Sequence, residues 1–244
     1  MNKVIFGIGG RAGSGKDTVA SMINYILQVG TTKANYKDWL INEIPMQQKC
    51  KNHTTHFADP LKDSLSIIYN IPRSYFDNRE YKESKFYSLD EHKFLSEDKL
   101  TTKHKVITSS HLKYDSIPMV KKLYNNKHIV ITLRDLMQYY GTNVCRNNLG
   151  NNIWIESTMK RVNNILGVYD YCIVADVRFE NECNSINSID DEFLYGVTIK
   201  VNRDVVKLDH ESEECVGNYT FEIDNTGSKM QLFYNVLDII QSVL

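Results

Sequence analysis

A glycine-rich segment near the N-terminus constrains the fold of this chain more than any other feature. The apolar run 4–8 is followed by several glycines and then by Gly15-Lys16, just before a segment with apolar residues at helical spacing. A strand that opens into such a loop lets backbone N–H groups surround a polyphosphate at the N-terminus of a helix. The spacing Gly10-x-x-x-x-Gly15-Lys16 is typical of a phosphate-binding loop, in which the lysine reaches the β- and γ-phosphates. The residues expected to bind these phosphates are Gly10, Gly13, Ser14, Gly15, Lys16, Asp17 and Thr18.

The residue after the lysine departs from the usual motif. Asp17 stands where serine or threonine is common, and the hydroxyl follows one residue later at Thr18. In the common motif that hydroxyl binds Mg²⁺. A carboxylate is also a hard oxygen donor suited to Mg²⁺, and a helix N-terminus favours its negative charge. We therefore expect Asp17 to bind the metal directly or through water, with Thr18 in support. The alternative is that Thr18 binds the metal and Asp17 caps the helix.

A dinucleotide-binding fold is the competing interpretation of the same segment, because Gly7-x-Gly9-x-x-Ala12 fits its fingerprint. That fold needs an acidic residue about twenty positions further on. Residues 28–32 read Gln-Val-Gly-Thr-Thr and supply none, and the fingerprint leaves Gly15-Lys16 unexplained. The phosphate loop is therefore the favoured interpretation.

Strand and helix patterns alternate along the chain, which indicates an α/β protein built on a doubly wound parallel sheet. We expect one domain over 1–244, with five strands at 4–8, 53–57, 171–175, 196–201 and 219–224. Residues 30–53 are polar and aperiodic and are expected to form a loop or a small excursion. Residues 70–128 interrupt the alternation and are expected to form an inserted helical or irregular subdomain on the substrate side.

The composition excludes several classes of partner. The net charge is about −1, so the chain has no overall positive field that would attract nucleic acid or an anionic membrane. The five cysteines form no C-x-x-C pair, and the N-terminal apolar run is too short to span a bilayer. We expect a cytoplasmic protein without a nucleic-acid or membrane partner, and the sequence leaves a homodimer open.

One expected helix carries a polar face with side chains suited to a nucleotide. In residues 132–142, Arg134, Gln138 and Gly141 follow each other at helical spacing, opposite an apolar stripe. An arginine can bind a phosphate through two N–H groups, a glutamine can read a base edge, and a glycine leaves room for a planar ring. An ordinary amphipathic helix is the alternative.

Two charged residues follow the apolar run 171–175, which reads as a central strand buried on both faces. Ligands of open α/β sheets bind at the carboxyl ends of the strands, so Asp176 and Arg178 lie where chemistry is expected. Trp154 is either a core aromatic or a wall on which a base stacks.

Taken in order, the motifs of the chain resemble those of the deoxynucleoside monophosphate kinases of tailed bacteriophages. The resemblance runs from end to end and is weakest at 30–52 and 85–128. The order of the motifs is more specific than any one of them. The motifs that carry the resemblance are Gly-Lys-Asp-Thr at 15–18, Ala-Asp-Pro-Leu-Lys-Asp at 58–63, Leu-Arg-Asp-Leu-Met-Gln-Tyr-Tyr-Gly-Thr at 133–142, Trp154, Asp-Val-Arg-Phe-Glu-Asn-Glu at 176–182, His-Glu-Ser-Glu at 210–213 and Ile-Asp-Asn-Thr-Gly-Ser at 223–228.

The resemblance implies a P-loop kinase fold like that of adenylate kinase. It also implies an enzyme that transfers the γ-phosphoryl group of ATP to a deoxynucleoside 5′-monophosphate with Mg²⁺. Arg134 would bind the acceptor phosphate, Gln138 and Trp154 would lie at the base, Asp176 would lie at the sugar or the metal, and Arg178 would neutralise charge on the transferring group. The catalytic residues would be Lys16, Asp176 and Arg178, and the monophosphate site would comprise Arg134, Gln138, Gly141, Thr142, Trp154 and Asp176.

The resemblance further implies a lid at 203–214, a loop on the adenine side at 224–228, and supporting roles for Glu182, Arg203, His210 and Glu213. If a phage encodes the chain, its place is the host cytoplasm. Two alternatives stay open. Another small-molecule P-loop kinase, acting on a coenzyme precursor or on phosphomevalonate, would share residues 1–18 without needing the set of Arg134, Gln138 and Trp154. A nucleotide-regulated binding module would keep the loop but would lack a catalytic Arg178.

Overall fold

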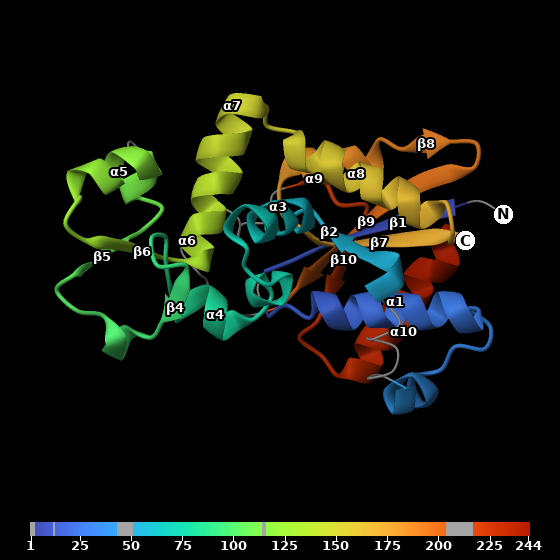
Figure 1. The fold of residues 1–244 in the computed structure, drawn as a ribbon. Coiled ribbons are helices and arrows are strands. Elements are labelled where there is room, and N and C mark those ends of the chain that lie inside the picture. Colours follow the sequence, from blue (N-terminus) through green and yellow to red (C-terminus); the bar gives the residue numbers. More distant parts are fainter. Residues whose placement is uncertain (1–2, 12, 43–50, 114–115, 204–216) are drawn as a thin grey trace. The chain divides into compact units, whose positions relative to one another are not determined.

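The computed structural model describes residues 3–11, 13–42, 51–113, 116–203 and 217–244. The chain divides into two compact units (Figure 1). The first contains Met1–Phe57 and Ile155–Leu244, and the second contains Ala58–Trp154. The insertion expected at 70–128 falls within the second unit, and one kinase domain carrying an inserted subdomain stays a prediction.

The first unit is built on a parallel sheet. Its five parallel strands in the described part of the chain are β1 (Lys3–Gly9), β2 (Thr54–His56), β7 (Tyr171–Val177), β9 (Leu194–Asn202) and β10 (Phe221–Asp224). They lie in the order β10-β9-β1-β7-β2, and the two-residue strand β8 (Asp190–Asp191) pairs antiparallel with β9. Strands are added on both sides of β1, so the sheet is doubly wound and the predicted fold class is confirmed.

Helices cover both faces of this sheet (Figure 1). Alternate residues of β1 point to opposite faces. Val4, Phe6 and Ile8 pack with α1 (Lys16–Val29) and α10 (Lys229–Val243). Ile5 packs in a separate core with α8 (Ile153–Leu166) and α9 (Glu180–Asn187). Burial on both faces explains why the strands read as continuous apolar runs.

The loop or small excursion expected at 30–53 contains a short helix. Residues 36–42 are helical, and Trp39 is fully buried, with its indole N–H donating to Ser21 Oγ at 3.3 Å. The Trp39 ring packs against Phe233 of α10 with ring centroids 6.0 Å apart. Trp39 and Tyr36 thus attach this helix to the core, although the sequence around them is polar. Residues 43–50 lie outside the described part.

The second unit contains a mixed sheet that the sequence does not predict. Its strands in the described residues are β3 (Phe86–Ser88), β4 (Lys93–Leu95), β5 (His104–Ile107) and β6 (His128–Thr132), in the order β4-β3-β6-β5. The expectation of a helical or irregular stretch at 70–128 is corrected accordingly. Strands of three to five residues are too short to show the alternation by which a strand is recognised in a sequence.

Short helices complete the second unit around its own apolar core. Leu65, Phe76, Ile131 and Leu136 are fully buried in that core. The helical elements described here are α3 (Asp59–Tyr69), α4 (Arg79–Glu83), α5 (Ile117–Leu123), α6 (Leu133–Gln138), a π-helical stretch (Tyr139–Arg146) and α7 (Asn147–Leu149), with 3₁₀ turns at Arg73–Phe76, Glu97–Lys99 and His111–Lys113. A further 3₁₀ turn, Lys51–His53, precedes β2 in the first unit. None of the helices in the described residues has the length and apolar character needed to cross a bilayer.

Candidate nucleotide-binding sites

The phosphate loop connects β1 to α1 in the first unit. Gly10 and Gly15 adopt φ angles of +145° and +100°, which L side chains rarely adopt. A Cβ at Gly10 would lie 2.6 Å from the Val201 carbonyl oxygen, so the position also lacks room for a side chain. The Ser14 N–H donates to the Arg11 carbonyl at 3.1 Å, and α1 begins at Lys16. The chain thus forms a tight loop directly before a helix N-terminus, which is the geometry that binds phosphate.

The Lys16 side chain folds back over this loop. Its Nζ donates to the Arg11 carbonyl at 3.0 Å and lies 3.4 Å from Asp176 Oδ1. Only 11% of the side chain is exposed. The ammonium group is therefore held at the loop by a carbonyl and a carboxylate.

Asp176 lies between two cations. It is in β7, and its φ of +70° is unusual for a residue other than glycine. Its Oδ1 lies 3.0 Å from Arg178 Nε as well as near Lys16. Burial raises the pKa of the Asp176 carboxyl, but the charges of Arg178 and Lys16 outweigh that effect and hold the pKa below its ordinary value. The structure thus brings together the three residues that the sequence analysis assigns to catalysis.

Glu182 fixes the turn that carries Arg178. Its side chain is 3% exposed, and Oε2 accepts hydrogen bonds from the Arg178 N–H at 2.9 Å and the Phe179 N–H at 3.3 Å. This carboxylate satisfies backbone donors at the N-terminus of α9, as in a capping box. Glu182 thus holds the backbone beside Arg178, and its supporting role in the kinase site stays a prediction.

The residues expected to bind the metal lie in the first turn of α1. Asp17 is exposed and Thr18 is half-buried. Among the described side chains, no group of three or more His, Cys, Asp or Glu residues is placed to hold a metal ion. Mg²⁺ usually combines one or two carboxylates with substrate phosphates and water, so the oxygen donors of Asp17, Thr18 and Asp176 fit a metal that arrives with a nucleotide.

Most of the segment expected to form a lid, 203–214, lies outside the residues that the structure describes. Arg203 follows β9 and is exposed. His210, Glu213 and residues 204–214 lie outside the described residues. Their roles stay predictions.

In the second unit, Arg134 lies in the first turn of α6. Thr132 caps this helix, accepting from the Asp135 N–H at 3.1 Å. Arg134 Nη2 donates to Glu83 Oε1 of α4 at 2.6 Å, and the arginine side chain is 46% exposed. The hydrogen bond from Arg134 lowers the pKa of Glu83. Arg134 is therefore oriented by one carboxylate and remains partly open to solvent.

A second cation lies near Arg134 without a carboxylate of its own. Burial lowers the pKa of Lys82 on α4, and the positive charges of Arg134 and Lys62 lower it further. No ion pair of Lys82 occurs within the described part of the molecule. Lys62 is paired with Asp77 and Arg134 with Glu83, so Lys82 adds a positive charge to this part of the second unit, and such a charge attracts anions.

Three further residues of the expected monophosphate site, Gln138, Gly141 and Trp154, have structural partners. Gln138 Oε1 accepts from Ser109 Oγ at 2.8 Å. Trp154 is 7% exposed, and its indole N–H donates to the Gly141 carbonyl at 3.0 Å, so it is the core aromatic of the two alternatives. A Cβ at Gly141 would lie 2.9 Å from Leu61 Cδ2, so this glycine packs closely against Leu61 of α3. Thr142 is exposed.

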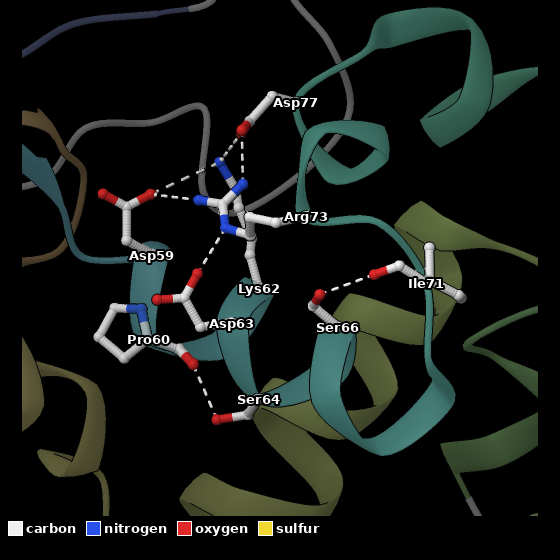
Figure 2. A network of polar contacts seen from close by, with 9 residues as sticks. All are labelled: Asp59, Pro60, Lys62, Asp63, Ser64, Ser66, Ile71, Arg73 and Asp77. Atoms are coloured by element: carbon white, nitrogen blue, oxygen red, sulfur yellow. Dashed lines mark hydrogen bonds and ion pairs between the residues drawn. The ribbon is translucent and has the colours of Figure 1, made fainter. Parts of the chain in front are cut away.

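A network of ion pairs that the sequence analysis misses joins α3 to the turn after it (Figure 2). The Arg73 guanidinium donates from Nη2 to Asp59 at 2.8 Å, from Nε to Asp63 at 2.6 Å and from Nη1 to Asp77 at 2.5 Å. Lys62 Nζ donates to Asp77 at 2.8 Å. Burial raises the pKa of Asp77, but Lys62 and Arg73 reverse the effect and lower it. The network fixes the start of α3 and holds Lys62 in place.

The fold and the loop together define the class of protein. A doubly wound parallel sheet whose central strand opens into a phosphate loop, with a lysine and an arginine beside it, is characteristic of P-loop phosphotransferases. The sequence matches the family of deoxynucleotide monophosphate kinases over residues 3–217, and the chain belongs to this family.

One relative supports the same assignment. The chain is 24% identical over 238 residues to the deoxynucleoside-5′-monophosphate kinase of Escherichia phage T5, a match that covers 87% of this chain and 85% of that protein. The predicted family, the kinase function and the phosphotransferase class are confirmed. Neither a kinase for a coenzyme precursor or phosphomevalonate nor a binding module is favoured.

Proposed function

We propose that this deoxynucleoside monophosphate kinase uses ATP as its phosphoryl donor, with Mg²⁺, and releases ADP and a deoxynucleoside diphosphate. The observation that carries the proposal is the cluster of Lys16, Asp176 and Arg178 at the phosphate loop, where Asp176 Oδ1 lies 3.4 Å from Lys16 Nζ and 3.0 Å from Arg178 Nε. The ATP phosphates bind at the loop 10–18 and the N-terminus of α1. The other substrate is a small nucleotide, and neither nucleic acid nor a membrane takes part.

The chemistry follows from these charges. An oxygen of the acceptor monophosphate attacks the γ-phosphorus, the bond to the β-γ bridging oxygen breaks, and that oxygen leaves with ADP. The transition state is loose and needs no covalent nucleophile, so catalysis rests on positioning and on charge stabilisation. Lys16 and Arg178 neutralise charge on the phosphates, and Asp176 holds both cations until the substrate binds. When bound, Mg²⁺ neutralises charge on the β- and γ-phosphate oxygens.

The acceptor binds through the second unit. Arg134 binds its phosphate, assisted by the positive charge of Lys82 and Lys62. Support comes from the placement of Arg134, whose guanidinium is oriented by Glu83 at 2.6 Å while the side chain stays 46% exposed. Gln138 and Trp154 serve the base, with Trp154 acting from the core as the support of Gly141, whose carbonyl it binds at 3.0 Å.

Arg134→Lys tests the acceptor assignment. The lysine keeps the charge but loses the two-pronged N–H geometry, so we expect KM for the deoxynucleoside monophosphate to rise roughly tenfold. KM for ATP should stay within a factor of about two, because the donor has no assigned contact with Arg134. Steady-state kinetics with each substrate varied in turn makes the comparison. Equal increases in the two KM values would remove Arg134 from the acceptor site.

The metal ligand is tested by Asp17→Asn and Thr18→Ala. If Asp17 binds Mg²⁺, Asp17→Asn should raise the Mg²⁺ concentration for half-maximal activity by at least about tenfold, since even outer-shell partners of metal ligands contribute that much to affinity. Thr18→Ala should shift it less. Activity is measured against Mg²⁺ at fixed total ATP. An unchanged midpoint for Asp17→Asn together with a strong shift for Thr18→Ala would assign the metal to Thr18.

A further inference from the structure

The loop between β10 and α10 holds its own shape at both ends. Asp224 Oδ1 accepts from the Thr226 N–H at 3.0 Å, and Ser228 Oγ accepts from the Gln231 N–H at 3.2 Å and caps α10. These local bonds fix the backbone on either side of Asn225. Asn225 is thus presented by a loop that is already ordered.

Asn225 connects this loop to two other parts of the first unit. Its backbone N–H donates to the Asn202 carbonyl at the end of β9, at 2.8 Å. Its side-chain Nδ2 donates to the Ser14 carbonyl of the phosphate loop at 2.7 Å, although the two residues are 211 positions apart in the sequence. The residue is therefore anchored to the sheet by its backbone while its amide reaches the loop.

The phosphate loop is shaped to receive this amide. Ser14 is fully buried, and a Cβ at Gly15 would lie 2.5 Å from Asn225 Nδ2. Gly15 thus serves two needs: its φ of +100° is rarely adopted by L side chains, and a Cβ at this position would displace the Asn225 amide. The contact is built into the loop by the sequence at Gly15.

The hydrogen bond orients one peptide group of the loop. The Ser14–Gly15 peptide is trans, so the Ser14 carbonyl and the Gly15 N–H point in opposite directions. An amide that holds the carbonyl therefore turns the Gly15 N–H away from Asn225. Backbone N–H groups at this position of a phosphate loop are the donors that bind phosphate oxygens.

We propose that Asn225 is a positioning residue for the donor phosphates, which holds the Ser14–Gly15 peptide in the orientation that binds them. The inference rests on the proposed function, because it takes the loop as the ATP site. This role differs from contact with the adenine base of ATP, which the family resemblance implies for the loop 224–228.

Asn225→Asp and Asn225→Ala test the proposal. The aspartate has nearly the same shape, but its carboxylate cannot donate to the Ser14 carbonyl and faces it with like charge. The alanine removes the amide without adding charge. We expect both variants to raise KM for ATP, Asn225→Asp by roughly tenfold, with KM for the deoxynucleoside monophosphate unchanged within a factor of about two. Asn163→Asp, which makes the same charge change at an exposed position of α8, is the matched control and should behave as wild type.

Binding of inorganic tripolyphosphate, measured by calorimetry, identifies the part of ATP that is affected. We expect both Asn225 variants to weaken tripolyphosphate binding by about the same factor as ATP binding. Loss of ATP affinity with unchanged tripolyphosphate affinity would overturn the proposal, because Asn225 would then act on the base. An active wild type whose Asn225→Ala variant has unchanged kinetics would overturn the proposal alone, whereas a wild type that transfers no phosphoryl group would overturn the proposed function with it.

Discussion

Replacing Lys16 with methionine is expected to lower kcat by on the order of 10²–10³-fold while leaving the chain folded. Methionine keeps much of the length and packing of the side chain but removes the charge at the loop. The loss should appear in kcat, because the Lys16 ammonium stabilises the charge on the γ-phosphoryl group more strongly in the transition state than in the bound substrate. Circular dichroism and thermal unfolding should show a fold close to wild type.

The matched control is Lys33→Met, which removes a charge from an exposed turn of the same unit. It should retain wild-type turnover. Near-normal kcat for Lys16→Met would show that the loop does not bind the phosphates of the donor, and the proposed donor site would then be wrong.

Replacing Asp176 with asparagine is expected to lower kcat by about 10²-fold. Asparagine tolerates the left-handed backbone conformation better than most residues, so the φ of +70° is retained and only the charge is lost. Without the carboxylate, Lys16 and Arg178 lose the group that lies 3.4 Å and 3.0 Å from them and repel each other. Each cation then loses one of the groups that hold it in the position that serves the transferring group, although Lys16 keeps its bond to the Arg11 carbonyl.

Asp238→Asn supplies the comparison, because Asp238 is an exposed acid on α10 with no ion pair in the described residues. It should leave kcat unchanged. If Asp176→Asn had wild-type kcat and a lower thermal midpoint, Asp176 would be a structural counter-ion and its assignment to catalysis would fail. Steady-state kinetics and calorimetric unfolding of the two variants separate these results.

The main sheet could be predicted because its strands are buried on both faces. Runs such as 171–175 are continuous and apolar, and the glycine loop marks the end of β1. The position of Asp176 and Arg178 just after the run 171–175 also predicts that they lie at the site, because ligands of open α/β sheets bind at the carboxyl ends of the strands. The strands of the second unit could not be predicted, because segments such as Phe86–Ser88 are only three residues long and pair with β6, distant in the sequence, as well as with the nearby β4.

The residues that position the site depend on contacts that no local pattern reveals. Asn225 meets Ser14 across 211 positions, and Arg73 binds Asp59, Asp63 and Asp77 through a turn whose geometry the sequence does not specify. Glu182 did carry a signal, because a glutamate at the third position of a helix is typical of a capping box. The usual serine or threonine cap is absent, since Phe179 occupies that position.

The most direct test of the account is a transfer assay with the purified full chain. It is incubated with Mg²⁺ and ATP labelled at the γ-phosphate, together with each deoxynucleoside monophosphate and ribonucleotide counterpart in turn, and the products are separated by thin-layer chromatography. The account predicts label in a deoxynucleoside diphosphate, formed one for one with ADP and abolished in Lys16→Met. Label that appears only as inorganic phosphate, or in no deoxynucleotide at all, would contradict it.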